Sequence, residues 1–196
     1  MLNKTNVAII ILGLIVFVHA IILTKLQFFP YPELFVYPYL TNHGLKPYSQ
    51  ILDQHFPGLL FLPINFDNLG MNDEVVARYW LIGVVIIIHL FLFLILRKIL
   101  RDNKKALLVN FLYLIWQPFF EGWVLWLDTF LPLFLLPAFY FASLSEQKNS
   151  VHFLIKDKLF LTGLLLGIGI VFKQTTIPLA GLFFCIFYGK RENLGQ

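Results

Sequence analysis

Residues 7–23 read VAIIILGLIVFVHAIIL, an apolar run close to the roughly 20 residues that a helix needs to cross the hydrocarbon core of a bilayer. Further runs of this kind follow at Trp80–Leu96, Ala106–Phe120 and Trp123–Ala142, and Leu159–Tyr188 is long enough for two short passes. The fold class that we expect is therefore all-α, a polytopic transmembrane helical protein with five or six spans.

The composition supports a membrane protein and excludes several other classes. Hydrophobic residues make up 59% of the 196 residues and charged residues 13%, whereas soluble domains have about 45–50% and about 25%. The 22 Phe, 8 Tyr and 4 Trp exclude a disordered chain, which cannot bury aromatic rings. The single cysteine, Cys185, allows no internal disulfide and no Cys/His zinc cluster. The net charge of +4 reports topology and lipid headgroups, so we expect no nucleic-acid partner.

The distribution of charge predicts the orientation. With six spans and a cytoplasmic N-terminus, the inside segments hold 11 of the 15 basic residues, namely Lys4, Arg97, Lys98, Arg101, Lys104, Lys105, Lys148, Lys156, Lys158, Lys190 and Arg191. The outside segments hold the other four, Lys25, Lys46, Arg78 and Lys173, together with 7 of the 11 acids. This bias follows the positive-inside rule. We therefore expect a multi-pass protein of the cell membrane with its N-terminus in the cytoplasm.

The first apolar run has a second interpretation as a signal peptide. Lys4 precedes the run, and Val18-His19-Ala20 resembles a small-residue cleavage site. We favour a membrane span because the apolar residues continue to Leu23, which is long for the hydrophobic part of a signal peptide.

Residues 1–196 are expected to form a single transmembrane domain in which residues 25–78 are an extracytoplasmic loop. This loop is rich in Phe, Tyr, Leu and Pro, unlike a flexible linker. Its prolines divide it into short pieces, of which Leu34–Leu40 and Ser49–Phe56 are expected to be short helices lying at the membrane interface. Asn72 or Asp73 can cap the helix that enters the second span.

Four ionisable residues stand in apolar surroundings. Glu33 and Asp53 are either helix caps or interfacial ion pairs, for instance with Lys46 or Arg78, or they are general bases whose pKa is raised by partial burial. Asp128 and Lys173 lie near the outer ends of spans. They can line a functional cavity or form an internal ion pair, and Lys173 can also snorkel to the interface.

Four motifs stand out in the chain: YPELF at 31–35, NHGLKPY at 42–48, DQHFPG at 53–58, and GLLLGIGIVFKQT at 163–175. Together they resemble motifs of the GT-C glycosyltransferases, and the similarity is closest to protein O-mannosyltransferases and aminoarabinose transferases. The order of these motifs agrees with that family and covers essentially the whole chain. Two departures stand out. The family commonly has two adjacent acids where this chain has Pro32-Glu33, and its members are about twice as long, so the chain looks like an N-terminal portion.

The resemblance implies transfer of a sugar, with inversion, from a polyprenyl-phosphate donor to an acceptor on the extracytoplasmic face. It implies catalytic roles for Glu33 and Asp53 and substrate binding by His55 and Lys173. Arg78 is an alternative phosphate partner on the same face. We expect Asp128 to contribute to substrate binding as well. The implied partners are the lipid-linked donor, membrane lipids and an acceptor that the sequence does not name.

No metal ion or other cofactor is expected, because Lys and Arg can neutralise a phosphate and the sequence has no tightly spaced carboxylates. A rival hypothesis is a non-enzymatic membrane protein, such as a small transporter half or an assembly subunit. Transporters place their sites at mid-depth in broken helices, and the segment from Gly167 to Pro178 allows that interpretation. The isolated acids instead concentrate in one outer loop, which favours transfer chemistry.

Overall fold

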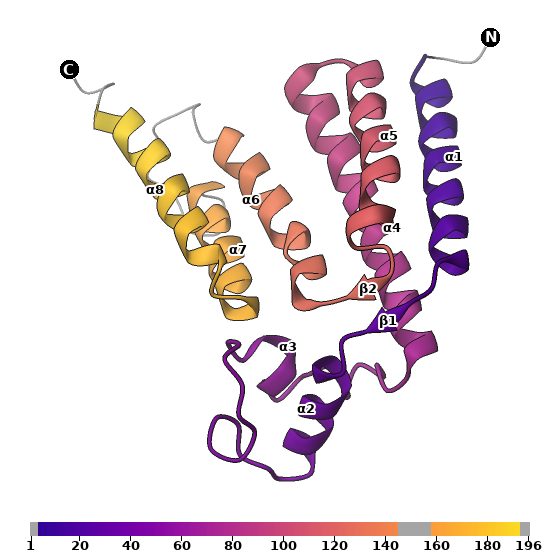
Figure 1. The fold of residues 1–196 in the computed structure, drawn as a ribbon. Helices are drawn as coiled ribbons and strands as arrows, with labels where there is room; N and C mark the ends of the chain where they lie inside the picture. The colour runs from indigo at the N-terminus through magenta and orange to yellow at the C-terminus, as the bar shows by residue number, and fades with distance from the viewer. Residues whose placement is uncertain (1–3, 145–157, 193–196) are drawn as a thin grey trace.

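The protein is built almost entirely of helices, as the computed structural model of residues 4–144 and 158–192 shows (Figure 1). In chain order the elements are α1 (Lys4–Lys25), β1 (Phe29–Pro30), α2 (Glu33–Asn42), α3 (Gly58–Phe61), α4 (Glu74–Leu100), α5 (Asn103–Phe120), β2 (Val124–Leu125), the 3-10 helix η1 (Leu127–Phe130), α6 (Pro132–Leu144), α7 (Lys158–Phe172) and α8 (Thr176–Glu192).

The long helices form two groups that meet along α4. Helix α1 packs on α4 and α5, α6 packs on α7, and α7 contacts α8, while the contact of α4 with α6 joins the groups. The N-terminus, the C-terminus and the turn between α4 and α5 lie at one end, and α2 and α3 lie at the other (Figure 1). We call the latter the α2 end.

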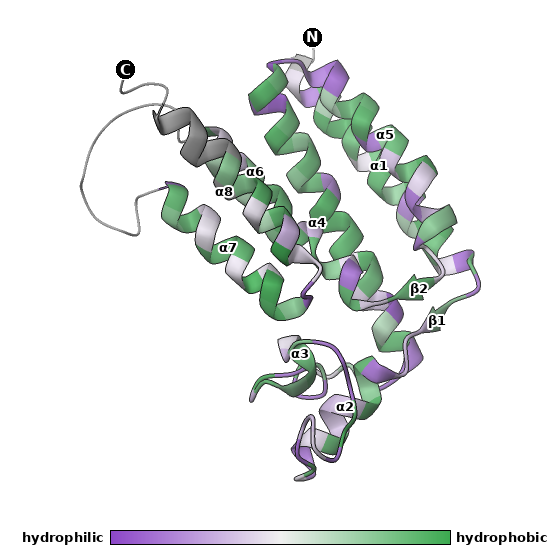
Figure 2. Cartoon of the chain, turned by 60° about the vertical axis from the view of Figure 1, so that its left-hand side comes forward, coloured by the Kyte–Doolittle hydropathy of each residue, from purple (hydrophilic) through white to green (hydrophobic). Residues whose placement is uncertain are grey.

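Apolar side chains cover the outside of the long helices. Three helical stretches are long and apolar enough to cross a membrane, namely Thr5–Lys25, Glu74–Leu100 and Leu127–Leu144. Large apolar side chains on their surfaces remain exposed, such as Phe17 at 63%, which suits lipid rather than water. Figure 2 shows hydrophobic colour along these helices and hydrophilic colour near the ends and around α2. The expected count of five or six spans stays a prediction.

A buried polar network joins α1, α4 and α5. His19 Nδ1 lies 2.8 Å from His89 Nε2, and His19 Nε2 lies 2.8 Å from Gln117 Oε1. His89 Nδ1 lies 2.7 Å from Asn110 Oδ1, and the Asn110 amide donates to the Ala106 carbonyl. Polar groups withdrawn from water must find partners in the protein, so this network, called the helix network below, fixes how the three helices pack.

The loop of residues 25–78 contains one of the two helices expected in it. Residues Leu34–Leu40 lie in α2, as predicted. The prediction of a helix at Ser49–Phe56 is wrong, because Tyr48 has a φ of 64° and Asp53 turns the chain by accepting a hydrogen bond from the His55 backbone N–H. Asp73 caps α4 by accepting from the Val76 N–H at 2.8 Å. Whether α2 lies at a membrane interface stays a prediction.

Two contacts attach this loop to the long helices. Strand β1 pairs in parallel with β2, which lies about 95 residues later in the chain, with Phe29 opposite Val124. Gly58 has a φ of +36°, and a Cβ there would lie 3.3 Å from the Phe172 Cα at the end of α7. Glycine therefore allows the backbone of α3 to approach the backbone of α7. Together these contacts bring the loop beside β2, η1 and the end of α7.

Candidate functional site

A cavity of about 590 Å³ opens where these elements meet. Its walls come from α2, the loop that precedes α3, the β2–η1 connection and the end of α7. The side chains that line it are Tyr31, Glu33, Leu34, Tyr37, Leu52, Asp53, Gln54, His55, Leu60, Trp126, Leu127 and Lys173. Four of the six residues expected at a site, namely Glu33, Asp53, His55 and Lys173, therefore line one cavity, which we call the α2-end cavity.

Glu33 is the first residue of α2, where the helix dipole favours a negative charge. Its side chain is 28% exposed, and it accepts no hydrogen bond from the residues that the structure describes; His55 Nδ1 lies 3.8 Å from its Oε2. Partial burial raises the pKa of the Glu33 carboxyl, the charge of Asp53 raises it further, and His55 opposes these effects. Glu33 therefore has the environment of a proton acceptor with increased basicity.

Asp53 and His55 form a pair on the same wall. His55 Nδ1 donates to Asp53 Oδ1 at 2.8 Å, and the His55 backbone N–H donates to the same oxygen at 3.2 Å. The Asp53 side chain is only 3% exposed, and its Oδ2 has no hydrogen-bond partner in the part of the chain that the structure describes. The fold thus brings the Glu33 carboxylate close to Asp53 and His55, although Glu33 precedes Asp53 by 20 positions in the sequence. Asp53 and His55 are two positions apart and meet through a local turn. One ligating atom from each of Glu33, Asp53 and His55 lies within 4.8 Å of the others, a cluster capable of holding a metal ion.

Lys173 enters the cavity from the end of α7 and is paired. Its ammonium group donates to Asp128 Oδ2. The internal ion pair, which was one of the alternatives that the sequence allowed for these two residues, is therefore present. Asp128 belongs to η1 and does not line the cavity, but it holds the cation that does. The next residue, Gln174, donates to the Gln54 carbonyl at 3.1 Å and ties this corner to the loop.

Arg78 is placed elsewhere. Its Nη1 donates to the carbonyls of Leu23, Thr24 and Leu26 at 3.0–3.2 Å, and its guanidinium lies 5.1 Å from the centre of the Phe28 ring. The last carbonyls of a helix have no partner within the helix and carry partial negative charge. Arg78 therefore closes the end of α1 and does not line the α2-end cavity.

The sequence interpretation missed three aromatic residues of the cavity. The rings of Tyr31 and Trp126 stack with centroids 5.4 Å apart, across the β1–β2 pairing. Tyr37 lies one helical turn after Glu33, and burial raises the pKa of its phenol, with smaller effects from Glu33 and Asp53. The i, i+4 spacing was a usable signal for Tyr37. No local signal connects Tyr31 with Trp126, because their contact depends on a pairing that is distant in sequence.

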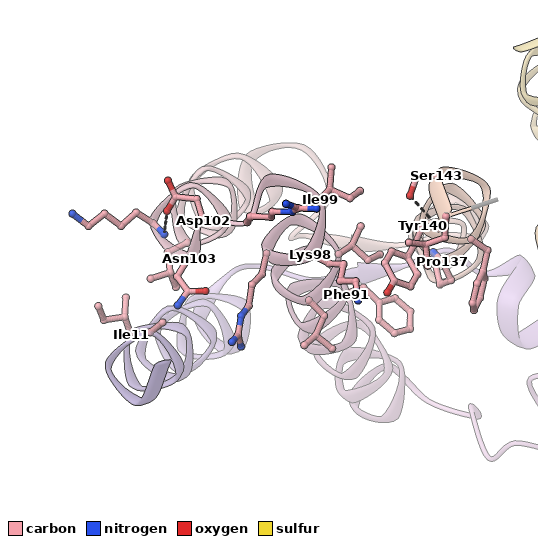
Figure 3. Close-up of a pocket in the computed structure, with 18 of the residues that line it drawn as sticks. Ile11, Phe91, Lys98, Ile99, Asp102, Asn103, Pro137, Tyr140 and Ser143 are labelled. Atoms are coloured by element: carbon pink, nitrogen blue, oxygen red, sulfur yellow. Dashed lines mark hydrogen bonds between the residues drawn. The ribbon is translucent and has the colours of Figure 1, made fainter. Parts of the chain in front are cut away.

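A larger cavity, of about 2100 Å³, lies at the opposite end (Figure 3). Ile11, Asp102 and Asn103 border it on one side and Pro137, Tyr140 and Ser143 on the other, as Figure 3 shows. Its lining is apolar with a basic rim formed by Arg97, Lys98, Arg101, Lys104 and Lys158. The acid among the described lining residues, Asp102, caps α5 by accepting from the Lys104 N–H. Because the described lining residues of this larger cavity include no other acid that could serve as a base, the α2-end cavity is the better candidate.

Comparison with known proteins identifies the family. The family model of dolichyl-phosphate-mannose-protein mannosyltransferases matches residues 55–195, which include His55, Asp128 and Lys173 and exclude Glu33 and Asp53. No curated protein and no solved structure matches the chain. Because the model covers most of the chain, the chain belongs to the dolichyl-phosphate-mannose-protein mannosyltransferase family, a family of membrane glycosyltransferases that use lipid-linked sugar donors.

Proposed function

We propose that the chain transfers a sugar from a polyprenyl phosphate to a hydroxyl acceptor, and that the transfer takes place in the α2-end cavity. One observation carries the proposal: the same cavity is lined by the carboxylate of Glu33, which accepts no hydrogen bond from the described residues, and by the ammonium group of Lys173. A base for the acceptor and a cation for the leaving phosphate are the groups that such a transfer requires.

Glu33 is a better candidate for the base than Asp53. Asp53 Oδ1 already accepts two hydrogen bonds from His55, and the side chain is almost fully buried. The Glu33 carboxylate is more exposed, and its raised pKa makes it a stronger base. We therefore assign proton removal to Glu33, while Asp53 orients His55, whose Nε2 remains free of Asp53 and is able to bind the substrate.

In the transfer step, the acceptor oxygen attacks the anomeric carbon as Glu33 takes the hydroxyl proton. The bond between the anomeric carbon and the phosphate oxygen breaks, and the polyprenyl phosphate leaves with the electron pair. Attack opposite the leaving group inverts the anomeric carbon. Lys173, held by Asp128, neutralises the charge that develops on the phosphate.

The charge distribution supports an extracytoplasmic position for the cavity. The basic rim of Arg97, Lys98, Arg101 and Lys104 lies at the end opposite α2, and basic residues favour the cytoplasmic side.

Single cysteines at Ser49 and Asn103, in a Cys185→Ser background, test this orientation. An impermeant maleimide added to intact cells should label the first and spare the second, and labelling of both from the same side would refute it.

The activity is tested with Glu33→Gln. The full chain in lipid nanodiscs is supplied with polyprenyl-phosphate sugars and candidate acceptors, and release of polyprenyl phosphate and glycosylated acceptor is measured. Loss of general-base catalysis predicts a fall in turnover of about 10² to 10⁴-fold with donor binding retained. Glu74→Gln, which removes an exposed carboxylate at the start of α4, is the matched control. Near-normal turnover by Glu33→Gln would remove Glu33 as the base.

A further inference from the structure

Three ligating side chains on the cavity wall are spaced as metal ligands. His55 Nδ1 lies 2.8 Å from Asp53 Oδ1 and 3.8 Å from Glu33 Oε2. Zn²⁺ binds nitrogen and oxygen ligands at about 2.1 Å, so two ligands of a tetrahedral ion lie about 3.4 Å apart. The two measured separations fall on either side of that value. A bound ion therefore needs only small side-chain shifts and transfer of the His55 proton from Nδ1 to Nε2.

A second, independent observation points to a ligand at this place. The Asp53 side chain lines the cavity and is 3% exposed, yet its Oδ2 has no hydrogen-bond partner among the described residues. A buried carboxylate oxygen without a partner is costly. A cation that contacts Oδ2, either with both carboxylate oxygens or after rotation of the carboxylate, would compensate for the missing hydrogen bond.

The donor set selects the class of cation. Imidazole nitrogens and carboxylate oxygens are both zinc ligands, and three protein ligands are usual in an open zinc site, whereas Mg²⁺ and Ca²⁺ take six or more oxygen ligands. Two carboxylates also neutralise a divalent ion. The fourth coordination position opens into the 590 Å³ cavity, where water or a substrate oxygen can occupy it.

We propose that Glu33, Asp53 and His55 bind one divalent cation of the zinc class, and that this cation inhibits sugar transfer. The binding rests on the geometry of the three side chains, and the inhibition rests on the proposed function. A carboxylate that gives its electron pair to a metal cannot also take the proton of an acceptor. The ion would therefore prevent the Glu33 carboxylate from acting as a base. The protein would be active only when the site is free of metal.

Binding is measured by isothermal titration calorimetry on the full chain in nanodiscs, with any affinity tag removed and metals first stripped by a chelator. We expect one Zn²⁺ per chain and no comparable binding of Mg²⁺. Asp53→Asn and His55→Gln should each weaken Zn²⁺ binding by at least about tenfold. His43→Gln is the matched control, because His43 lies in the same loop and outside the cluster. Unchanged affinity in His55→Gln, or no saturable Zn²⁺ binding by the unsubstituted chain, would overturn the proposal.

A spectroscopic measurement removes the dependence on variants that could fail to fold. Co²⁺ replaces Zn²⁺ in such sites, and its visible absorption reports a low coordination number and displacement by Zn²⁺ in the unsubstituted protein. A visible band that Zn²⁺ abolishes at one equivalent supports the site. A spectrum of six-coordinate aqueous Co²⁺ throughout the titration contradicts it.

The activity measurement separates the two parts of the proposal. In a preparation that transfers sugar, transfer should fall in proportion to Zn²⁺ occupancy and return when a chelator is added. Transfer that rises or stays constant as Zn²⁺ binds would overturn the inhibition. If the protein transfers no sugar from any donor, the proposed function fails, while the calorimetry still decides whether the metal site exists.

Discussion

The helix network and the α2-end cavity both hold polar side chains in apolar surroundings, and they differ in how completely those groups are paired. His19, His89 and Asn110 are fully buried, and every ring nitrogen of the two histidines has a partner within 2.8 Å. In the cavity, Glu33 is 28% exposed, and neither its carboxylate nor Asp53 Oδ2 accepts a hydrogen bond from the described residues. The first set is closed to water and substrate, and the second set is open to them.

Proton counting shows how the helix network can be satisfied without charge. The Asn110 amide donates to the Ala106 carbonyl, so Asn110 Oδ1 must accept from His89 Nδ1. With neutral imidazoles, His89 Nε2 then accepts from His19 Nδ1, and His19 Nε2 needs a donor. Gln117 supplies that donor when its side-chain amide turns to present Nε2 to His19, an orientation that the network decides. One Gln117 amide atom, Nε2 as the amide stands or Oε1 after the turn, then lacks a partner among the described residues. The result is a continuous chain of hydrogen bonds across three helices.

This difference separates structural polar groups from functional ones. A buried network whose members satisfy each other contributes specificity and stability to packing. Unpaired or exposed ionisable groups that line a cavity remain available for a ligand. Substitutions in the two regions should therefore have opposite signatures, with stability affected in one and substrate kinetics in the other.

The largest expected effect on stability is that of His89→Leu. The substitution leaves His19 Nδ1 and Asn110 Oδ1 buried without partners, and each such group costs about 1–3 kcal/mol. We expect the free energy of unfolding in mixed micelles to fall by about 3 kcal/mol, while kcat and KM per folded molecule stay unchanged. Leu90→Val, at the exposed neighbouring position on α4, is the control. If His89→Leu were as stable as the unsubstituted protein, the helix network would not contribute to stability in the way that separates it from the cavity.

The next effect is that of Lys173→Gln, which should alter substrate kinetics and lower stability by less than about 1 kcal/mol, because the Asp128 side chain is 38% exposed and can be solvated. The substitution removes a cation that lines the cavity and leaves Asp128 without its partner. A charge-assisted hydrogen bond contributes about 1.5–3 kcal/mol, so the KM for the polyprenyl-phosphate donor should rise roughly 10- to 100-fold. Lys46→Gln, in the loop outside the cavity lining, provides the comparison. An unchanged donor KM would show that Lys173 does not bind the donor and that its role is limited to the ion pair with Asp128.

How much the sequence predicts depends on whether the interactions are local. The apolar runs at residues 7–23 and Trp80–Leu96 predict α1 and α4, with bounds that differ by a few residues at each end. The run Trp123–Ala142 was expected to be one span, but it begins with the extended strand β2 and the 3-10 helix η1 before α6. Pairing of Val124 with Phe29 overrides the hydrophobicity of that segment. No pattern within the segment itself indicates that pairing.

The candidate site was predictable only as a list of residues. Glu33, Asp53 and Lys173 stand out because each is charged in apolar sequence, and His55 stands out through the DQHFPG motif; all four line the cavity. The pairing of Lys173 with Asp128 and the approach of His55 to Glu33 depend on the tertiary contacts at Gly58 and β1. The same contacts create the cluster of two carboxylates and an imidazole, which explains why the sequence alone indicated no metal site.

Arg78→Met should have a smaller effect, and it tests the boundary between the two regions. Arg78 donates to three carbonyls at the end of α1, so its loss should lower the free energy of unfolding by about 1 kcal/mol. The donor KM should stay unchanged, and Arg78→Lys should recover part of the stability. A tenfold rise in donor KM with normal stability would instead return Arg78 to the role of phosphate partner.

The last prediction concerns the pH dependence of transfer by the chelator-treated protein. Burial and Asp53 raise the pKa of Glu33, and His55 lowers it. A general base must be ionised to act, so kcat/KM should rise with pH through that raised pKa, and its acid limb should lie above the ordinary carboxyl range of about pH 4. Asp53→Asn removes one raising effect and should move the limb to lower pH.

The control for this measurement is Glu74→Gln, which changes an exposed carboxylate outside the cavity and should leave the limb in place. Because kcat/KM reports ionisation of the free protein, donor and acceptor binding do not obscure the shift. If Asp53→Asn left the limb where it was or moved it to higher pH, Asp53 would not act on the base through its charge. Burial alone would then have to account for the raised pKa of Glu33, and the assignment of Glu33 as the base would depend on the Glu33→Gln measurement.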